Sequence, residues 1–99
     1  MTFNREDIFR LLDENGARIR SYGVRSLALF GSFARGDYTQ ASDLDFIVEF
    51  ETKSFDSYIG LKHFLEELFE RRVDLVLSNT IKPRLRDRIL AEAVYAQRL

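Results

Sequence analysis

The sequence predicts a small α/β or α+β domain in which three strands alternate with helices around one core. Two observations carry this prediction. Three short apolar runs read as strands, and the longer segments around them carry apolar residues at helical spacing. The chain has 99 residues, of which 45% are hydrophobic, which is enough for one domain with a modest core. We therefore expect a single domain over residues 1–99.

The order of the elements follows from apolar spacing and from capping residues. Thr2 or Asn4 can cap a first helix, which ends where Gly23 suits a C-terminal cap. Ser54 or Asp56 can start a later helix, and the chain breaks before a last one. The expected elements are a helix up to about residue 22, strands at about 24–30 and 43–50, a helix from 54 or 56 to about 69, a strand at about 73–77 and a helix at about 83–97.

Two acids stand at the start of the second apolar run. Asp43 and Asp45 follow Gly31 and Ser32 after ten intervening residues. Because strand side chains alternate between faces, we expect the two acids to point the same way and Leu44 to enter the core. Two carboxylates on one face repel unless a cation lies between them, and Mg²⁺ prefers such oxygen ligands. We predict that Asp43 and Asp45 bind Mg²⁺, since two ions roughly 3.5–4 Å apart suit in-line displacement at phosphorus.

The Gly-Ser turn supplies a site for phosphate. Gly31 has no Cβ, so a ligand can approach its backbone closely. We expect Ser32 to cap a short helix over residues 33–35 that Gly36 closes, and the start of a helix attracts phosphate. Gly31 and Ser32 are therefore predicted to hold the β- and γ-phosphates of a nucleoside triphosphate. Arg35 is a further candidate for contact with the triphosphate, although an ion pair with the nearby Asp37 or exposure to solvent explains it equally well.

A third acid lies inside the last apolar run. Asp74 interrupts an otherwise apolar segment, and a charge in a buried strand is expected to be paired or bound to a metal. We predict that Asp74 is the third metal ligand, on the ion that activates the attacking hydroxyl, and that it can accept the proton of that hydroxyl. Each motif alone is common, but their order and strand contexts together indicate nucleotidyl transfer.

The combined pattern resembles the nucleotidyltransferase superfamily of the DNA polymerase β type, and in particular its minimal nucleotidyltransferase branch. The resemblance covers residues 24–77 and implies a polymerase β-like fold with a mixed sheet flanked by helices, two Mg²⁺ ions and ATP as substrate. By the resemblance, Gly31 and Ser32 match the phosphate-binding turn of the family. The metal triad of the family is matched by Asp43, Asp45 and Asp74. One departure is Glu70-Arg71-Arg72, where the family often has Gly, and it concerns the turn before the third strand.

The resemblance also implies a biological role. Members of the branch are commonly the antitoxin of a two-gene module, whose toxin is a HEPN-domain protein. It implies a nucleotidyltransferase that moves AMP from ATP to a tyrosine of that toxin. Two alternatives stay open: an antitoxin that acts by binding alone, and nucleotidyl transfer to a small molecule. The chain has no room for an acceptor-binding domain, so we expect a partner protein to bring the hydroxyl.

The composition argues against several other classes of protein and of binding site. No cysteine is present, so disulfides and thiolate metal sites are absent. No run of 18 apolar residues and no signal-peptide pattern occurs, so we expect a cytoplasmic protein without a membrane span. The net charge of −1 argues against direct nucleic-acid binding. Apolar residues on the terminal helices allow a homo- or hetero-oligomer. His63, the only histidine, is expected at the surface.

Overall fold

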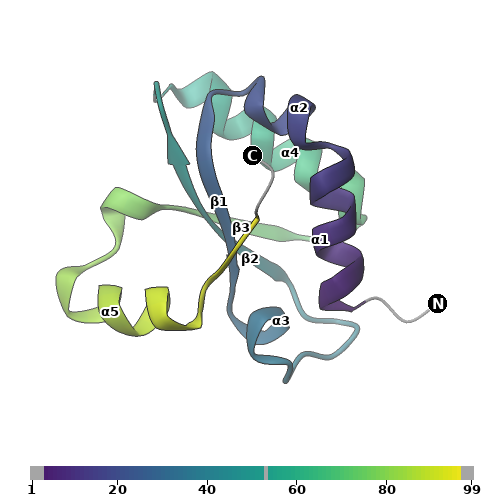
Figure 1. Ribbon diagram of the computed structural model, residues 1–99, viewed down its shortest axis with the longest axis vertical. Helices are drawn as coiled ribbons and strands as arrows, with labels where there is room; N and C mark the ends of the chain where they lie inside the picture. Colours follow the sequence, from purple (N-terminus) through teal and green to yellow (C-terminus); the bar gives the residue numbers. More distant parts are fainter. Residues whose placement is uncertain (1–3, 53, 97–99) are drawn as a thin grey trace.

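A twisted sheet of four strands forms the centre of the molecule (Figure 1). The computed structural model describes residues 4–52 and 54–96, and the strand order is β3-β2-β1-β4. The strands are β1 (Val24–Phe30), β2 (Leu44–Phe50), β3 (Val73–Leu77) and β4 (Val94–Tyr95). β1 pairs antiparallel with β2 and with β4, whereas β2 pairs parallel with β3. The sheet is therefore mixed, which confirms the predicted α+β class.

Helices precede and follow the strands. They are α1 (Arg5–Glu14), α2 (Gly16–Arg20), α3 (Ser32–Arg35), α4 (Phe55–Phe69) and α5 (Pro83–Glu92), with a 3₁₀ turn at Ser78–Thr80. Asn4 caps α1 through a capping box with Asp7, and the Ser54 side chain caps α4 by accepting a hydrogen bond from the Ser57 backbone. Thr2 and Gln97 lie outside the described residues. No helix within residues 4–52 and 54–96 has the length and apolar character needed to cross a membrane.

Both ends of the chain differ from the prediction. The first helix breaks at Asn15, whose φ of −110° and ψ of 17° are not helical and whose side-chain amide donates to the Leu11 carbonyl at 2.8 Å. The last helix ends at Glu92, because the next residues form β4 and pair with β1. The second strand begins at Leu44, one residue later than expected.

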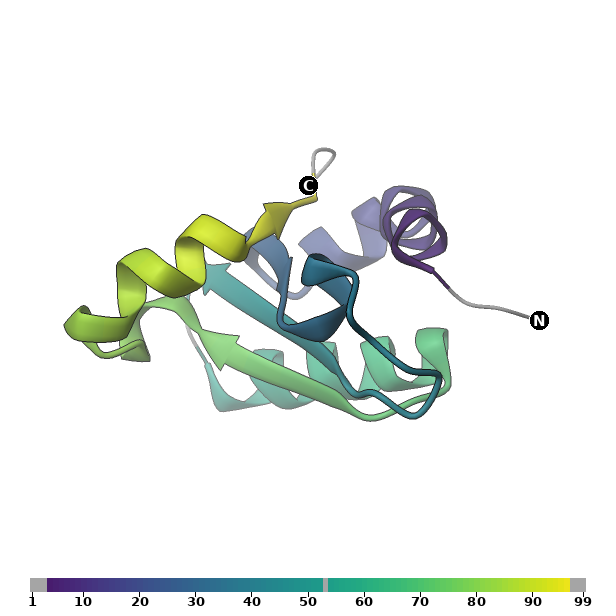
Figure 2. The same ribbon diagram turned by 90° about the horizontal axis from the view of Figure 1, so that it is seen from below.

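The two faces of the sheet are covered by different helices. α4 lies on one side and α5 on the other (Figure 2). On the α4 side, side chains of α1, α2 and α4 enclose the main core with Leu27, Leu44 and Phe46. On the α5 side, Ala28 and Ile47 pack with side chains of α5. Leu44 is fully buried, as predicted from its place between the two acids. Because side chains alternate along a strand, the residues on either side of Leu44 are turned towards the α5 side of the sheet.

Candidate functional site

The three predicted acids come from two neighbouring strands. Asp45 lies on β2, and the parallel register places it directly opposite Asp74 of β3. The antiparallel register places it opposite Phe30, the last residue of β1. Asp43 lies one residue before β2. Asp74 and Asp43 both lie close enough to Asp45 to raise the pKa of its carboxyl. The structure thus brings together all three acids that the motif predicted.

Asp45 is the acid whose ionisation is most perturbed by its surroundings. Partial burial, the neighbouring Asp74 carboxyl and the negative charges of Asp74 and Asp43 raise the pKa of the Asp45 carboxyl to about 6, while the charge of Arg35 lowers it. Burial is the largest of these causes. Asp45 therefore does not behave as an isolated surface charge, because its ionisation depends on its burial and on the neighbouring acids.

The environment of Asp74 differs from the one that predicted it. We expected a charge inside a buried strand, but β3 is an edge strand and the Asp74 side chain is exposed. The buried side chains of β3 are those of Val73 and Leu75, on either side of it. Asp74 therefore faces solvent beside the half-buried Asp45, on a side of the site that another molecule can reach.

The Gly-Ser turn packs against the acids. Gly31 has φ 76° and ψ −154°, a backbone conformation that is essentially restricted to glycine. A Cβ at Gly31 would overlap the Asp45 Oδ2 atom and would lie 3.0 Å from Asp45 Cγ. The predicted phosphate turn therefore touches the central acid. Gly36 ends α3 in the left-handed conformation, as predicted, but Gly31 rather than Ser32 is the N-cap, so Ser32 is the first residue of the helix.

Arg35 is held by two acids. Its Nε lies 3.2 Å from Asp37 Oδ2, and its Nη1 lies 3.3 Å from Glu92 Oε2. The ion pair with Asp37 is one of the explanations that the sequence left open. Glu92 was not expected, because it lies at the end of α5 and only the fold brings it to α3. The charge of Arg35 also lowers the pKa of Asp45, so this cation lies close enough to the acids to influence them.

The acids offer oxygen donors for a metal without forming a finished coordination shell. Among the residues that the structure describes, no group of three or more His, Cys, Asp or Glu side chains is arranged to hold a metal ion. The type of donor nevertheless fits Mg²⁺, which takes carboxylate oxygens and retains several waters. The negative charges of Asp74 and Asp43 add to the effect of burial in raising the pKa of Asp45, and a cation would offset those charges.

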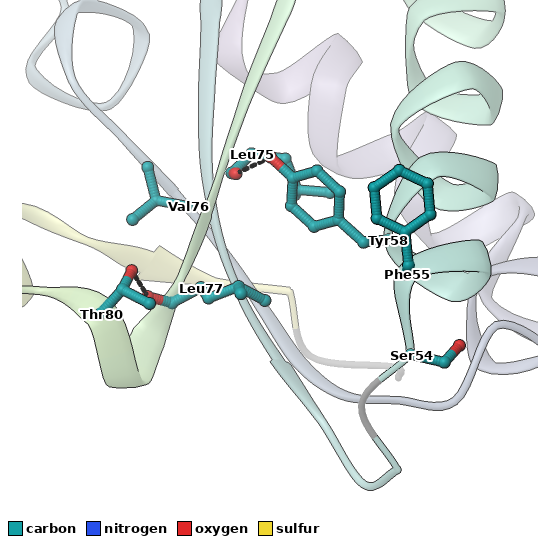
Figure 3. Close-up of a pocket in the computed structure, with 7 residues that line it drawn as sticks. All are labelled: Ser54, Phe55, Tyr58, Leu75, Val76, Leu77 and Thr80. Carbon is teal, nitrogen blue, oxygen red and sulfur yellow. Dashed lines mark hydrogen bonds between the residues drawn. The ribbon is translucent and has the colours of Figure 1, made fainter.

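A cavity of about 760 Å³ is lined by residues of α4 and β3. Phe55 and Tyr58 of α4 face Leu75 and Leu77 of β3 across it (Figure 3), and the Tyr58 hydroxyl donates to the Leu75 carbonyl at 2.6 Å. Its lining is largely apolar and, within the described residues, includes neither the three acids nor the Gly-Ser turn. Such a lining does not suit a triphosphate, so the acids and not this cavity define the candidate active site.

The chain is similar to proteins of one known family. The nucleotidyltransferase domain family matches residues 10–96. A proposed protein adenylyltransferase of Methanocaldococcus jannaschii is 46% identical over 74 residues, which are 74% of this chain and 80% of that protein. The protein adenylyltransferase MntA of Thermococcus cleftensis is 37% identical over 92 residues, which are 91% of this chain and 93% of that protein.

Solved structures agree in fold. A proposed minimal nucleotidyltransferase superposes with a TM-score of 0.81 and 33% identity, covering 93% of this chain and 95% of that chain. A complex of tri-AMPylated HEPN toxin with MNT antitoxin from Shewanella oneidensis matches with a TM-score of 0.63 and 18% identity, covering 92% of this chain and 73% of that one. At this identity the second match shows a shared fold.

Proposed function

The chain belongs to the nucleotidyltransferase domain family, and from this premise we propose that it is an antitoxin that transfers AMP from ATP to a tyrosine of a partner HEPN-domain toxin. Relatives that cover most of the chain carry the name protein adenylyltransferase. A protein of the same fold has been solved with an AMPylated HEPN toxin. The single observation that carries the proposal is the contact of the Gly31 turn with Asp45, beside Asp74 and Asp43.

In the proposed reaction, the backbone of Gly31 and Ser32 holds the β- and γ-phosphates. Asp43, Asp45 and Asp74 would hold Mg²⁺, which when bound supplies positive charge against the triphosphate and lowers the pKa of the acceptor hydroxyl. Arg35 adds a further cation at the triphosphate, exchanging its ion pairs with Asp37 and Glu92 for phosphate contacts.

The chemistry is an in-line displacement at the α-phosphorus. The tyrosine oxygen forms a bond to this phosphorus while the bond from phosphorus to the bridging oxygen breaks, and pyrophosphate leaves. Asp74 accepts the proton of the hydroxyl, since its exposed carboxylate lies on the side of the site that an acceptor can reach. Most of the catalytic effect comes from positioning and from charge stabilisation rather than from covalent catalysis.

The test uses ATP labelled on the α-phosphate, Mg²⁺ and a HEPN-domain protein encoded beside this chain. We expect label on that protein with wild type and none with Asp45→Asn. Asp87→Asn is the matched control, because Asp87 is an exposed acid on α5 outside the site. Absence of label with wild type would refute the proposed transfer. If Asp45→Asn still protected cells from the toxin, neutralisation would proceed by binding alone.

A further inference from the structure

The side chain of Arg71, which lies just before β3, contacts the segment before Asp43 and the helix that follows the Gly31-Ser32 turn. It lies in the turn between α4 and β3, directly after Glu70 and three residues before Asp74. Its Nη1 donates to the Ser42 carbonyl at 3.3 Å, immediately before Asp43. Its guanidinium carbon lies 5.2 Å from the centre of the Phe33 ring, in the first turn of α3. One side chain therefore contacts the segments that carry the phosphate turn and the first acid, next to the strand that carries the third.

We propose that Arg71 is a positioning residue, which sets the place of Asp43 and of the Gly31-Ser32 turn relative to Asp74. The proposal rests on the function proposed above and extends it to a residue outside the motif. In this role Arg71 acts through its contacts with Ser42 and Phe33.

The backbone around Asp43 supports this role. The Leu44 N–H donates to the Arg72 carbonyl at 3.0 Å, so the segment before β2 is hydrogen-bonded to the segment before β3. The Arg71 side chain adds the bond to Ser42, on the other side of Asp43. Asp43 precedes the regular strand, and these two bonds restrain the residues on either side of it. Removal of the side-chain bond leaves Ser42 held through its hydrogen bonds with Thr39 and leaves Leu44 held by Arg72, but no bond from the Ser42 carbonyl to the turn before β3.

The contact with α3 supports the second half of the proposal. Phe33 is buried, with 1% of its surface exposed, and stacks on Tyr38 with ring centres 4.2 Å apart. Since Phe33 follows Ser32 directly, contacts that hold its ring also restrain the neighbouring phosphate turn. A cation over an aromatic face is attracted to it, and a half-buried guanidinium also provides packing surface that a shorter side chain lacks.

Arg71 is expected to act by geometry and not by its charge. Arg35 is the cation that lowers the pKa of Asp45. Arg71→Ala removes the bond to Ser42 and the contact with Phe33 but keeps the backbone. Arg71→Lys keeps a cation near the ring but loses the planar fork of the guanidinium. Arg72→Ala is the matched control. Arg72 is the next residue in the chain and is exposed, so its replacement removes the same charge, and the backbone hydrogen bond to Leu44 remains.

The test measures the dissociation constant of a fluorescent ATP analogue with Mg²⁺, well below the melting temperature of every variant. We expect Arg71→Ala to weaken binding by about tenfold, Arg71→Lys to restore part of the loss and Arg72→Ala to stay within about twofold of wild type. Phe33→Leu is also made in wild type and in Arg71→Ala. The losses of affinity from Phe33→Leu and Arg71→Ala should be non-additive, because both substitutions remove the contact between these two side chains.

Hydrogen exchange without nucleotide gives a second readout that does not depend on the proposed function. We expect faster exchange at residues 42–44 and 33–36 in Arg71→Ala than in Arg72→Ala. If wild type does not bind the ATP analogue, the proposed function fails, while the exchange comparison still tests Arg71. If wild type binds and Arg71→Ala matches Arg72→Ala in affinity and exchange, the inference about Arg71 is wrong. If Arg71→Ala does not fold, the same comparisons between Arg71→Lys and Arg72→Ala decide it.

Discussion

Replacement of Gly31 by alanine tests the contact between the phosphate turn and the acids. Gly31 has φ 76° and ψ −154°, where any side chain is strained. An added Cβ would also overlap Asp45 Oδ2 and would lie 3.0 Å from Cγ and 3.2 Å from Cβ of Asp45. The substitution therefore has two separate costs, one in the backbone of the turn and one in the displacement of the Asp45 carboxylate.

The two costs can be estimated and separated. Backbone strain of this kind costs on the order of 1–3 kcal/mol, and forcing an extra carbon into a packed site costs about 1–3 kcal/mol more. The sum of about 2–6 kcal/mol is large against the roughly 5–15 kcal/mol that stabilises a domain of this size. Gly36→Ala is the matched control. Gly36 also has a positive φ, of 89°, but a Cβ there would meet nothing within 4 Å.

Urea denaturation of both variants measures the difference in the free energy of unfolding. We expect Gly31→Ala to lose at least about 1 kcal/mol more than Gly36→Ala, and Asp45→Ala to remove most of that excess when combined with Gly31→Ala. Mg²⁺–ATP affinity should fall in Gly31→Ala and stay near wild type in Gly36→Ala. Equal losses of stability in the two variants, or an excess unchanged in the Asp45→Ala background, would refute the proposed contact.

Three further predictions follow from local features. Asp45→Asn removes a carboxyl whose pKa rises from 3.8 to about 6 on folding, so ionisation of this carboxyl destabilises the wild-type fold above about pH 6 and not below about pH 4. Urea unfolding at pH 8 and near pH 4 measures the effect. The variant should be about 1–2 kcal/mol more stable than wild type at pH 8, allowing for screening, and equal to it near pH 4. Glu70→Gly should raise stability by roughly 0.5–1 kcal/mol, because Glu70 has a left-handed φ of 51°, and a melting temperature unchanged or lowered would contradict this. Asn4→Ala should cost about 1 kcal/mol, or about 4–8 °C in melting temperature, by breaking the capping box with Asp7, whereas an unchanged melting temperature would show the cap to be unimportant.

The strands and the acids were predictable because their signals are local. β1 and β3 have the predicted bounds, and Gly36 closes α3 as its sequence position indicated. The break at Asn15 could have been predicted, since Asn followed by Gly commonly marks a turn. β4 could not, because its two residues become a strand only by pairing with β1 at Ala28 and Leu29.

The candidate site also combines features that local sequence signals indicate with contacts that only the fold brings about. The sequence indicated three acids as candidates, but the reason it offered for Asp74 was wrong, because β3 is an edge strand and the side chain is exposed. The contacts of Glu92 with Arg35, and of Arg71 with Ser42 and Phe33, join residues that are far apart in the chain, so only the fold reveals them. The only signal near Arg71 was the departure at Glu70-Arg71-Arg72, whose first residue takes the left-handed conformation that favours glycine.

By itself, the sequence determined which chemical groups are available to this protein: a glycine turn at the end of one strand, and three carboxylates on or directly before two others. These features follow from strand periodicity and turn stereochemistry, which act between neighbours in the chain. Only the tertiary structure decided that Asp45 lies opposite Asp74 and against Gly31. Strand register is set by which faces are buried and by hydrogen bonds to a neighbouring strand, and both depend on residues far away in the chain.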